Sequence, residues 1–216
     1  EQKYPFLPEI GHDAGRGWFA KWRLPFFVDE STFGNVILEY YSRFSEIGTG
    51  LDLRYRAFES SSGGTFAFYR LVGRGDSISV DWNDTVQLNE TTQLGLFAGF
   101  RSGLLSQTSG NLRTGLNLAG REEEWAWGVA VFREQNLVDP EADEDTQGVR
   151  YLSLERFPEL SISRGAISLD ENIPLNFSTS LNWGRYREES VSGEINESTR
   201  LDGGIQGTTD RLELFE

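Results

Sequence analysis

Residues 17–27 read GWFAKWRLPFF. The even-numbered positions, from Trp18 to Phe26, are all apolar, whereas Lys21 and Arg23 stand among the odd-numbered ones. A period of two predicts a β-strand with two unlike faces, and about 9–11 residues suffice to cross a bilayer as a tilted strand. Pro25 interrupts the run. Because proline cannot donate a backbone hydrogen bond, its position predicts a sheet edge, a bulge or a seam.

The same alternation recurs through the rest of the chain, separated by turns rich in Gly, Ser, Asn and Asp. Longer strands are expected at 34–44, 51–57, 65–72, 78–88, 94–100, 112–119, 125–133, 175–186 and 200–207. Two short strands are expected at 149–154 and 160–163. Residues 1–16 read as an extended lead-in or linker, and 17–216 as about a dozen strands. The pattern predicts an all-β fold.

Composition excludes several classes of protein. The formal net charge of −14 argues against a nucleic-acid partner, which requires a basic face. The absence of Cys excludes thiol catalysis and disulfides. No apolar run approaches the 18 residues of a transmembrane helix. The single histidine, His12, precedes the first long strand among glycines, which disfavours a serine–histidine hydrolase. We therefore expect a non-enzymatic protein without a cofactor.

Alternation alone does not separate a soluble β-sandwich from an outer-membrane barrel, because both have one apolar and one polar face per strand. Three features favour the barrel. The strands approach ten residues, against about five or six in soluble sheets. Their polar positions are small and uncharged in several strands. Aromatic residues recur near strand ends, at Trp18, Trp82, Trp125 and Tyr186. We predict an antiparallel transmembrane β-barrel in the outer membrane.

Three segments resemble the start of the barrel in the LPS-assembly protein LptD (organic-solvent-tolerance, OstA) family. They read YPFLPEIGHDAGRGWFAKWRLPFF, GNVILEYYSRFSEIGTGLDLRYR and GGTFAFYRL. A fourth, FPELSISRGAISLDENIPLNFSTSLNWGRYREE, resembles a mid-barrel stretch. About a dozen strands is roughly half of that family's barrel, so the chain is expected to be the N-terminal part of a larger one. The family's redox cysteines are absent here.

The resemblance implies a translocon that receives lipopolysaccharide, or a related glycolipid, from periplasmic β-bridge proteins. It also implies that residues 1–16 lead in from an upstream periplasmic domain. A plug lipoprotein of the LptE type would occupy the lumen, and outer-membrane lipids would surround the barrel. The cargo would leave sideways through a lateral seam between the first and last strands, with Trp18, Trp22 and Pro25 as its seam residues. Members of the family have a weakened seam, and in this sequence only Pro25 matches that feature.

The odd-numbered face of the first long strand places Lys21 and Arg23 toward the lumen, where their charges would oppose lipid phosphates. Glu39, Arg43, Arg54 and Arg56 are expected to share that lining, although ordinary lumen polarity explains any one of them.

The alternative functions are a general porin and a soluble secreted β-sandwich binding module. An acidic stretch with Asp139, Glu141, Asp143 and Asp145 offers oxygen ligands for Ca²⁺, but Leu154 stands where a bidentate Glu belongs, so no metal site is predicted.

Overall fold

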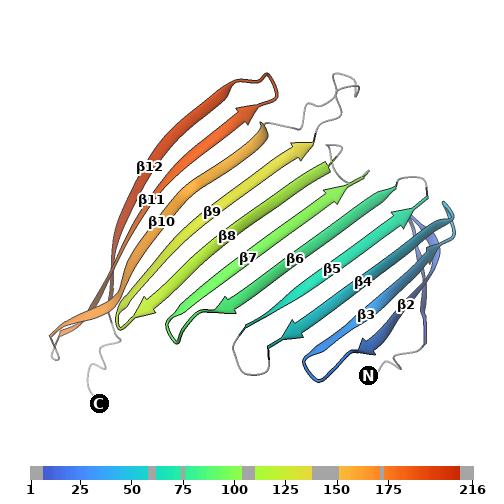
Figure 1. Ribbon diagram of the computed structural model, residues 1–216, viewed down its shortest axis with the longest axis horizontal. Coiled ribbons are helices and arrows are strands. Elements are labelled where there is room, and N and C mark those ends of the chain that lie inside the picture. The colour runs from blue at the N-terminus through green and yellow to red at the C-terminus, as the bar shows by residue number, and fades with distance from the viewer. Residues whose placement is uncertain are drawn as a thin grey trace, which may run out of the picture.

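The computed structural model describes residues 7–57, 62–73, 76–103, 110–137, 151–170 and 173–209. These residues form twelve strands (Figure 1). In chain order they are β1 (Glu9–Asp13), β2 (Gly17–Phe27), β3 (Thr32–Tyr41), β4 (Glu46–Arg56), β5 (Gly63–Val72), β6 (Ser77–Gln87), β7 (Thr92–Ser102), β8 (Gly110–Glu122), β9 (Trp125–Leu137), β10 (Tyr151–Asp170), β11 (Ile173–Ser190) and β12 (Ile195–Thr209). The prediction of an all-β fold is confirmed.

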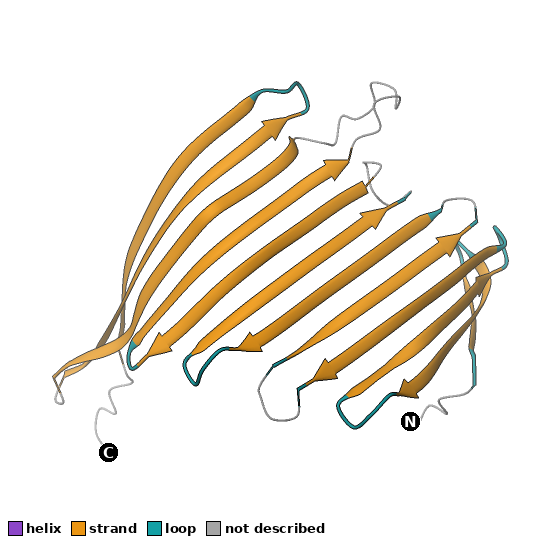
Figure 2. Ribbon diagram, viewed as in Figure 1, coloured by secondary structure: helices purple, strands orange, loops and turns teal. Residues whose placement is uncertain are grey.

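All twelve strands belong to one sheet, in which each strand pairs antiparallel with its neighbours in sequence (Figure 2). β1 and β12 are the two edges, so the sheet is an open meander and not a closed barrel. No second sheet packs on it among the described residues. We call the end that carries the β2–β3, β6–β7 and β8–β9 connections the lower end, as drawn in Figure 1, and the opposite end the upper end.

Two hairpin turns at the lower end share one design. The β2–β3 turn reads VDEST (28–32) and the β6–β7 turn reads LNETT (88–92). Asp29 accepts hydrogen bonds from the backbone N–H and the hydroxyl of Ser31, at 2.8 and 2.6 Å. Asn89 accepts the equivalent bonds from Thr91, at 2.9 and 3.1 Å. An Asp or Asn side chain that bonds its own backbone two residues on is a standard way to reverse a chain.

Two differences from the expected strands have physical causes. The lead-in of residues 1–16 contains β1, which pairs with residues 17–21 of β2. The two short strands expected at 149–154 and 160–163 are parts of the single strand β10. There, Phe157 and Pro158 stand opposite one residue on each neighbour, Val131 on β9 and Arg185 on β11. This bulge changes the phase of the alternation, and a period-two reading stops at it.

Burial in this sheet is the reverse of that in a soluble protein. The three most buried side chains, Tyr41, Leu71 and Glu46, lie on the polar face and are only 4%, 7% and 8% exposed. Large apolar side chains on the other face stay exposed, such as Ile47 at 54% and Leu201 at 66%. Figure 1 shows the sheet curving at both ends. Because the three most buried side chains lie on the polar face, we place that face inside the curve. The polar face is therefore concave and the apolar face convex.

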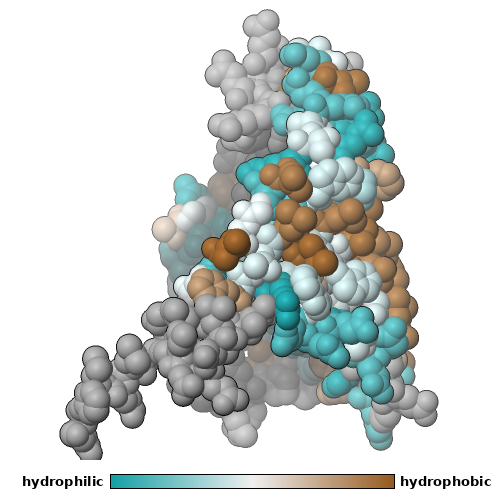
Figure 3. Space-filling view, turned by 90° about the vertical axis from the view of Figure 1, so that its left-hand side faces the viewer, coloured by the Kyte–Doolittle hydropathy of each residue, from teal (hydrophilic) through white to brown (hydrophobic). Residues whose placement is uncertain are grey.

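The convex face carries a continuous apolar band. Cross-strand partners on it include Trp22 with Leu38, Leu51 with Phe68, and Leu116 with Val131. Several charged residues on this face stand toward the ends of the sheet's strands, among them Arg70, Asp84, Glu122, Arg133 and Arg164. Figure 3 shows hydrophobic side chains gathered at mid-height, with hydrophilic ones above and below. No helix among the described residues is long and apolar enough to cross a membrane.

Candidate functional site

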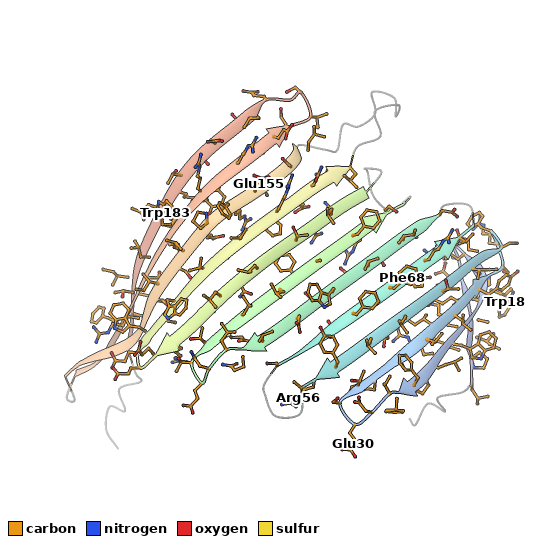
Figure 4. The ribbon with its side chains drawn as sticks, viewed as in Figure 1. Trp18, Glu30, Arg56, Phe68, Glu155 and Trp183 are labelled. Carbon is orange, nitrogen blue, oxygen red and sulfur yellow. The ribbon has the colours of Figure 1, made fainter. Side chains whose placement is uncertain are left out.

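The concave face is the candidate site, because it gathers the polar side chains of neighbouring strands into one surface. Its strand register places Lys21 opposite Glu39, Asn35 opposite Asp52, and Arg54 opposite Thr65. The predicted lumen residues Lys21, Arg23, Glu39, Arg54 and Arg56 all share this face. Figure 4 shows Arg56 at the lower end of β4 and Glu30 at the tip of the β2–β3 turn.

Near the upper ends of β3–β5, a tyrosine–glutamate cluster (Glu39, Tyr41, Tyr69) forms the most buried part of this face. Glu39 accepts a hydrogen bond from the Tyr69 hydroxyl at 2.7 Å and one from the Tyr41 hydroxyl at 3.0 Å. Tyr69 reaches β3 from β5 because Gly48, on the intervening strand, leaves space for its ring; a side chain at Gly48 would collide with it. Two phenols thus satisfy one half-enclosed carboxylate.

Two cations lie against the Tyr41 ring of this cluster. The Lys21 ammonium lies 4.7 Å from the centre of the Phe19 ring and 5.6 Å from that of Tyr41. The Arg16 guanidinium lies 4.8 Å from the Tyr41 ring centre. These are cation–π distances. Lys21 is therefore held against the concave face of the sheet, where it contributes positive charge beside two aromatic rings.

A second part of the concave face is an open groove near the lower ends of β3–β6, with a volume of about 630 Å³. Phe33, Arg54, Arg56, Asn83 and Thr85 are among its lining residues. Neither guanidinium forms an ion pair with another described residue. Arginine presents five N–H donors in a planar fork, so two unpaired arginines beside an aromatic ring suit an anionic group, such as a phosphate, attached to a sugar.

Opposite this groove in the sheet, β10–β12 present a smoother wall. A hollow of about 490 Å³ near their lower ends is lined largely by small side chains, among them Ser163, Ser178, Ser180 and Gly204. Large residues thus fill the concave face at β2–β5, and small ones line it at β10–β12. The concave face therefore has two open spaces, one over the arginines of β4 and one over the small residues of β10–β12.

Arg43 lies outside the strand in which it was expected. β3 ends at Tyr41, and Arg43 sits in the following turn, where it donates hydrogen bonds to the carbonyls of Ala14 (2.9 Å) and Gly15 (3.3 Å). The Ser42 hydroxyl accepts from the Trp18 N–H at 2.9 Å in the same place. Arg43 therefore ties the β3–β4 turn to the β1–β2 turn instead of lining the concave face.

The predicted seam residues Trp18 and Trp22 lie on the convex face, and Pro25 lies on the concave one. Trp18 is 63% exposed and meets the His12 ring edge-on at 5.3 Å. β1 pairs with β2 only as far as Lys21, so residues 22–27 have no neighbour on that side among the described strands.

The backbone of Pro25 points to this free edge. The Trp18 carbonyl accepts from Ser42, and the Val28 N–H donates to Thr32, so both bond toward β3. Because the bonding direction alternates along a strand, even-numbered residues of β2 pair with β3 and odd-numbered ones face away. The nitrogen of Pro25 therefore sits on the unpaired side, where a further strand would find one donor fewer.

The acidic stretch with Asp139, Glu141, Asp143 and Asp145 lies outside the described residues. Within the described ranges, no group of three or more His, Asp or Glu side chains is placed to hold a metal ion.

Several polar contacts on the concave face were not anticipated from sequence. Arg101 pairs with Asp81 at 3.4 Å, and Asn111 donates to both Glu134 (2.8 Å) and Asn136 (2.7 Å). Each joins adjacent strands, so an assumed register would have been needed to find them. The tyrosine–glutamate cluster did leave a signal, since Gly48 and Gly50 alternate on β4 and a large side chain commonly covers such gaps.

No protein-family model matches the chain, and neither does any curated protein. The chemistry of the concave face is therefore inferred from its own side chains.

Proposed function

We propose that this chain forms wall strands of an outer-membrane β-barrel that conducts an amphiphilic glycolipid, lipopolysaccharide or a related one, into the outer leaflet. The observation that carries the proposal is the reversed burial. A sheet that exposes Ile47 and Leu201 on its convex face and encloses Glu46 on its concave face matches a hydrocarbon exterior and a wet interior.

The chemistry of the concave face supports a glycolipid as cargo. Arg54 and Arg56 in the lower groove offer forks for phosphate, and the small side chains of β10–β12 leave room for sugars. Neither feature calls for covalent chemistry, so the proposal is a conduit and not an enzyme. The resemblance to the LptD family adds the expected partners: a plug lipoprotein and periplasmic β-bridge proteins.

The lateral exit is proposed at the free edge of β2. Beyond Lys21, this edge lacks a neighbour among the described strands. The nitrogen of Pro25, which carries no hydrogen, faces this edge. In hydrocarbon an unpaired backbone group costs several kcal/mol, so a seam with fewer bonds would open more readily. Trp18 and Trp22 would flank the opening on the lipid side.

The membrane orientation can be tested directly, because the chain has no native cysteine. Single cysteines replace Leu51, Asp52, Leu53 and Arg54 in turn, and the full chain is folded into phosphatidylcholine vesicles. A water-soluble maleimide should label positions 52 and 54 and spare 51 and 53. Equal labelling at all four positions, or a chain that stays in solution without vesicles or detergent, would contradict the proposal.

The cargo is tested by charge reversal in the groove. In cells that depend on this protein for surface glycolipid, Arg54→Glu combined with Arg56→Glu should reduce the glycolipid at the surface, because phosphate is then repelled. The matched pair of lysine substitutions keeps the charge and should retain most of the export. Unchanged export in the glutamate variant, together with solute conductance across bilayers, would favour the porin instead.

A further inference from the structure

Four charged side chains form one row across the upper part of β9–β12 on the convex face. Arg133, Glu155, Arg187 and Glu197 are direct partners in the strand register, one on each strand. Arg133 pairs with Glu155 at 3.3 Å, Glu155 with Arg187 at 3.8 Å, and Arg187 with Glu197 at 4.0 Å. Arg185, on the same face, pairs with Glu197 at 2.7 Å. We call these five residues the charged row.

The charged row stands directly above the apolar band. On the same face, Leu160, Trp183 and Leu201 are partners in register across β10–β12. Trp183 and Arg187 are four residues apart on β11, a rise of about 13 Å along the strand. Figure 4 shows Glu155 on β10 nearer the upper end than Trp183 on β11. With Trp183 in hydrocarbon, the charged row lies at the level of lipid headgroups.

The charged row contains three guanidiniums and two carboxylates, in a chain whose net charge is −14. A third carboxylate, Glu189, lies two residues beyond Arg187 on the same face, where it accepts a hydrogen bond from the Ser153 hydroxyl at 3.3 Å. Its arginine side chains are 44–58% exposed. Three of its four contacts are longer than 3 Å, and only the Arg185–Glu197 pair is short. Since each guanidinium has five donors, most of them remain available to an external anion.

We propose that the charged row binds the phosphate of a membrane-lipid headgroup, whose acyl chains lie along Leu160, Trp183 and Leu201. The proposal rests on the proposed membrane orientation of the sheet. Arginine forks bind phosphate oxygens in pairs, and the glutamates hold the three forks apart. A lipid would use both features, its phosphate at the arginines and its acyl chains along the apolar residues beneath them. Free phosphate would contact only the arginines.

The test uses the full chain in phosphatidylcholine vesicles with a trace of spin-labelled phosphatidic acid or spin-labelled phosphatidylcholine. The immobilised fraction of each lipid is read from the electron-spin resonance spectrum. The protein should prefer phosphatidic acid, and R185Q combined with R187Q should reduce that preference by roughly fivefold for each arginine lost. R101Q combined with R113Q, which removes two arginines from the concave face, should leave it unchanged.

A second pair of substitutions has the opposite sign. E155Q combined with E197Q removes the competing carboxylates and should raise the preference for phosphatidic acid, a gain that a damaged fold would not produce. Equal immobilisation of both lipids by the unmodified protein would overturn the proposal. So would displacement of phosphatidic acid by an excess of inorganic phosphate, which would indicate a free-anion site. Cysteine labelling of β4 reports the membrane orientation separately, so failure of the lipid site alone is distinguishable.

Discussion

Tyr69 shows how a single contact organises the concave face. Its hydroxyl crosses β4 to reach Glu39, 30 positions away in sequence, and the absence of a side chain at Gly48 makes the crossing possible. Tyr41 donates to the same carboxylate from within β3. Side chains thereby join β3 to β5 across β4, in addition to the backbone ladder of the three strands.

We predict that Tyr69→Phe lowers the free energy of unfolding by about 1–3 kcal/mol, because a partly enclosed carboxylate loses one of its two phenol donors. Chemical unfolding of the protein in detergent micelles measures the change. The control is Tyr40→Phe, on the convex face, where the side chain is 44% exposed. That variant should stay within about 0.5 kcal/mol of the parent. Equal effects of the two variants would refute a special role for the cluster.

The stability that Asp29 gives the β2–β3 turn should depend on pH, whereas the stability that Asn89 gives the β6–β7 turn should not. Hydrogen bonds from the Ser31 hydroxyl and backbone N–H hold the pKa of Asp29 below its ordinary value. A depressed pKa stabilises the fold above the unfolded-state pKa, and this stabilisation is lost as the pH falls through the folded value. Ser31→Ala should therefore raise the pKa of Asp29 and weaken the turn most when Asp29 is ionised.

Nuclear magnetic resonance titration of the Asp29 carboxyl measures this pKa. The matched control is Thr91→Ala, which removes the equivalent hydroxyl from Asn89, a side chain that does not ionise. Its effect on stability should be the same on both sides of the carboxyl titration. An Asp29 pKa that does not move in Ser31→Ala would show that the hydroxyl is not the cause.

Among the strands, β10 contains a bulge that the sequence pattern does not indicate. Its bulge at Phe157 and Pro158 places Glu155 on the convex face and Leu160 on the same face, five positions later. Without the bulge, an odd separation would put these residues on opposite faces. The bulge therefore aligns the charged row with the apolar band beneath it.

We predict that deletion of Phe157 is tolerated, because it leaves one residue opposite Val131 and restores regular pairing. Deletion of Leu160, a regularly paired residue, should be damaging, because it turns one segment of β10 to the wrong face. Circular dichroism and the thermal midpoint in micelles compare the two. Similar losses in both deletions would show that the bulge itself is required for the fold.

The sheet as a unit has two free edges, at β1 and β12. An unpaired edge exposes backbone donors and acceptors that invite another strand. The strands in the middle of the sheet, such as β7, have a neighbour on each side. The backbone N–H groups are thus least protected from solvent at β1 and β12, the two edges where further strands could pair.

We expect amide hydrogen exchange to follow this arrangement. In micelles, the N–H groups of β12 that face away from β11 should exchange fast, and those of β7 should exchange slowly, because only the latter are all paired. Mass spectrometry of overlapping fragments resolves the two strands. Slow exchange along the whole of β12 would mean that a further strand or a second copy covers this edge.

Much of this fold could be read from local pattern. The alternation in residues 17–27 predicted β2 and its two faces. The turn expected before residue 51 was wrong, because Gly48, Thr49 and Gly50 lie inside β4, where the absence of a side chain at Gly48 leaves room for the Tyr69 ring. The pattern failed where it changes phase, at Phe157 and Pro158, and where a strand is short, as in β1. Arg43 was misplaced because a turn residue continues the parity of the strand before it. Local periodicity carries no information about where a ladder ends.

The amino-acid order alone settled the strand type and the division into an apolar and a polar face, because side-chain direction alternates with every residue of an extended chain. The three-dimensional arrangement settled which face is concave, which residues meet across strands, and that the sheet is open. Curvature and register depend on contacts between distant segments, such as Tyr69 with Glu39 or Arg187 with Glu197. No local pattern encodes such contacts, because they arise only when all strands are paired.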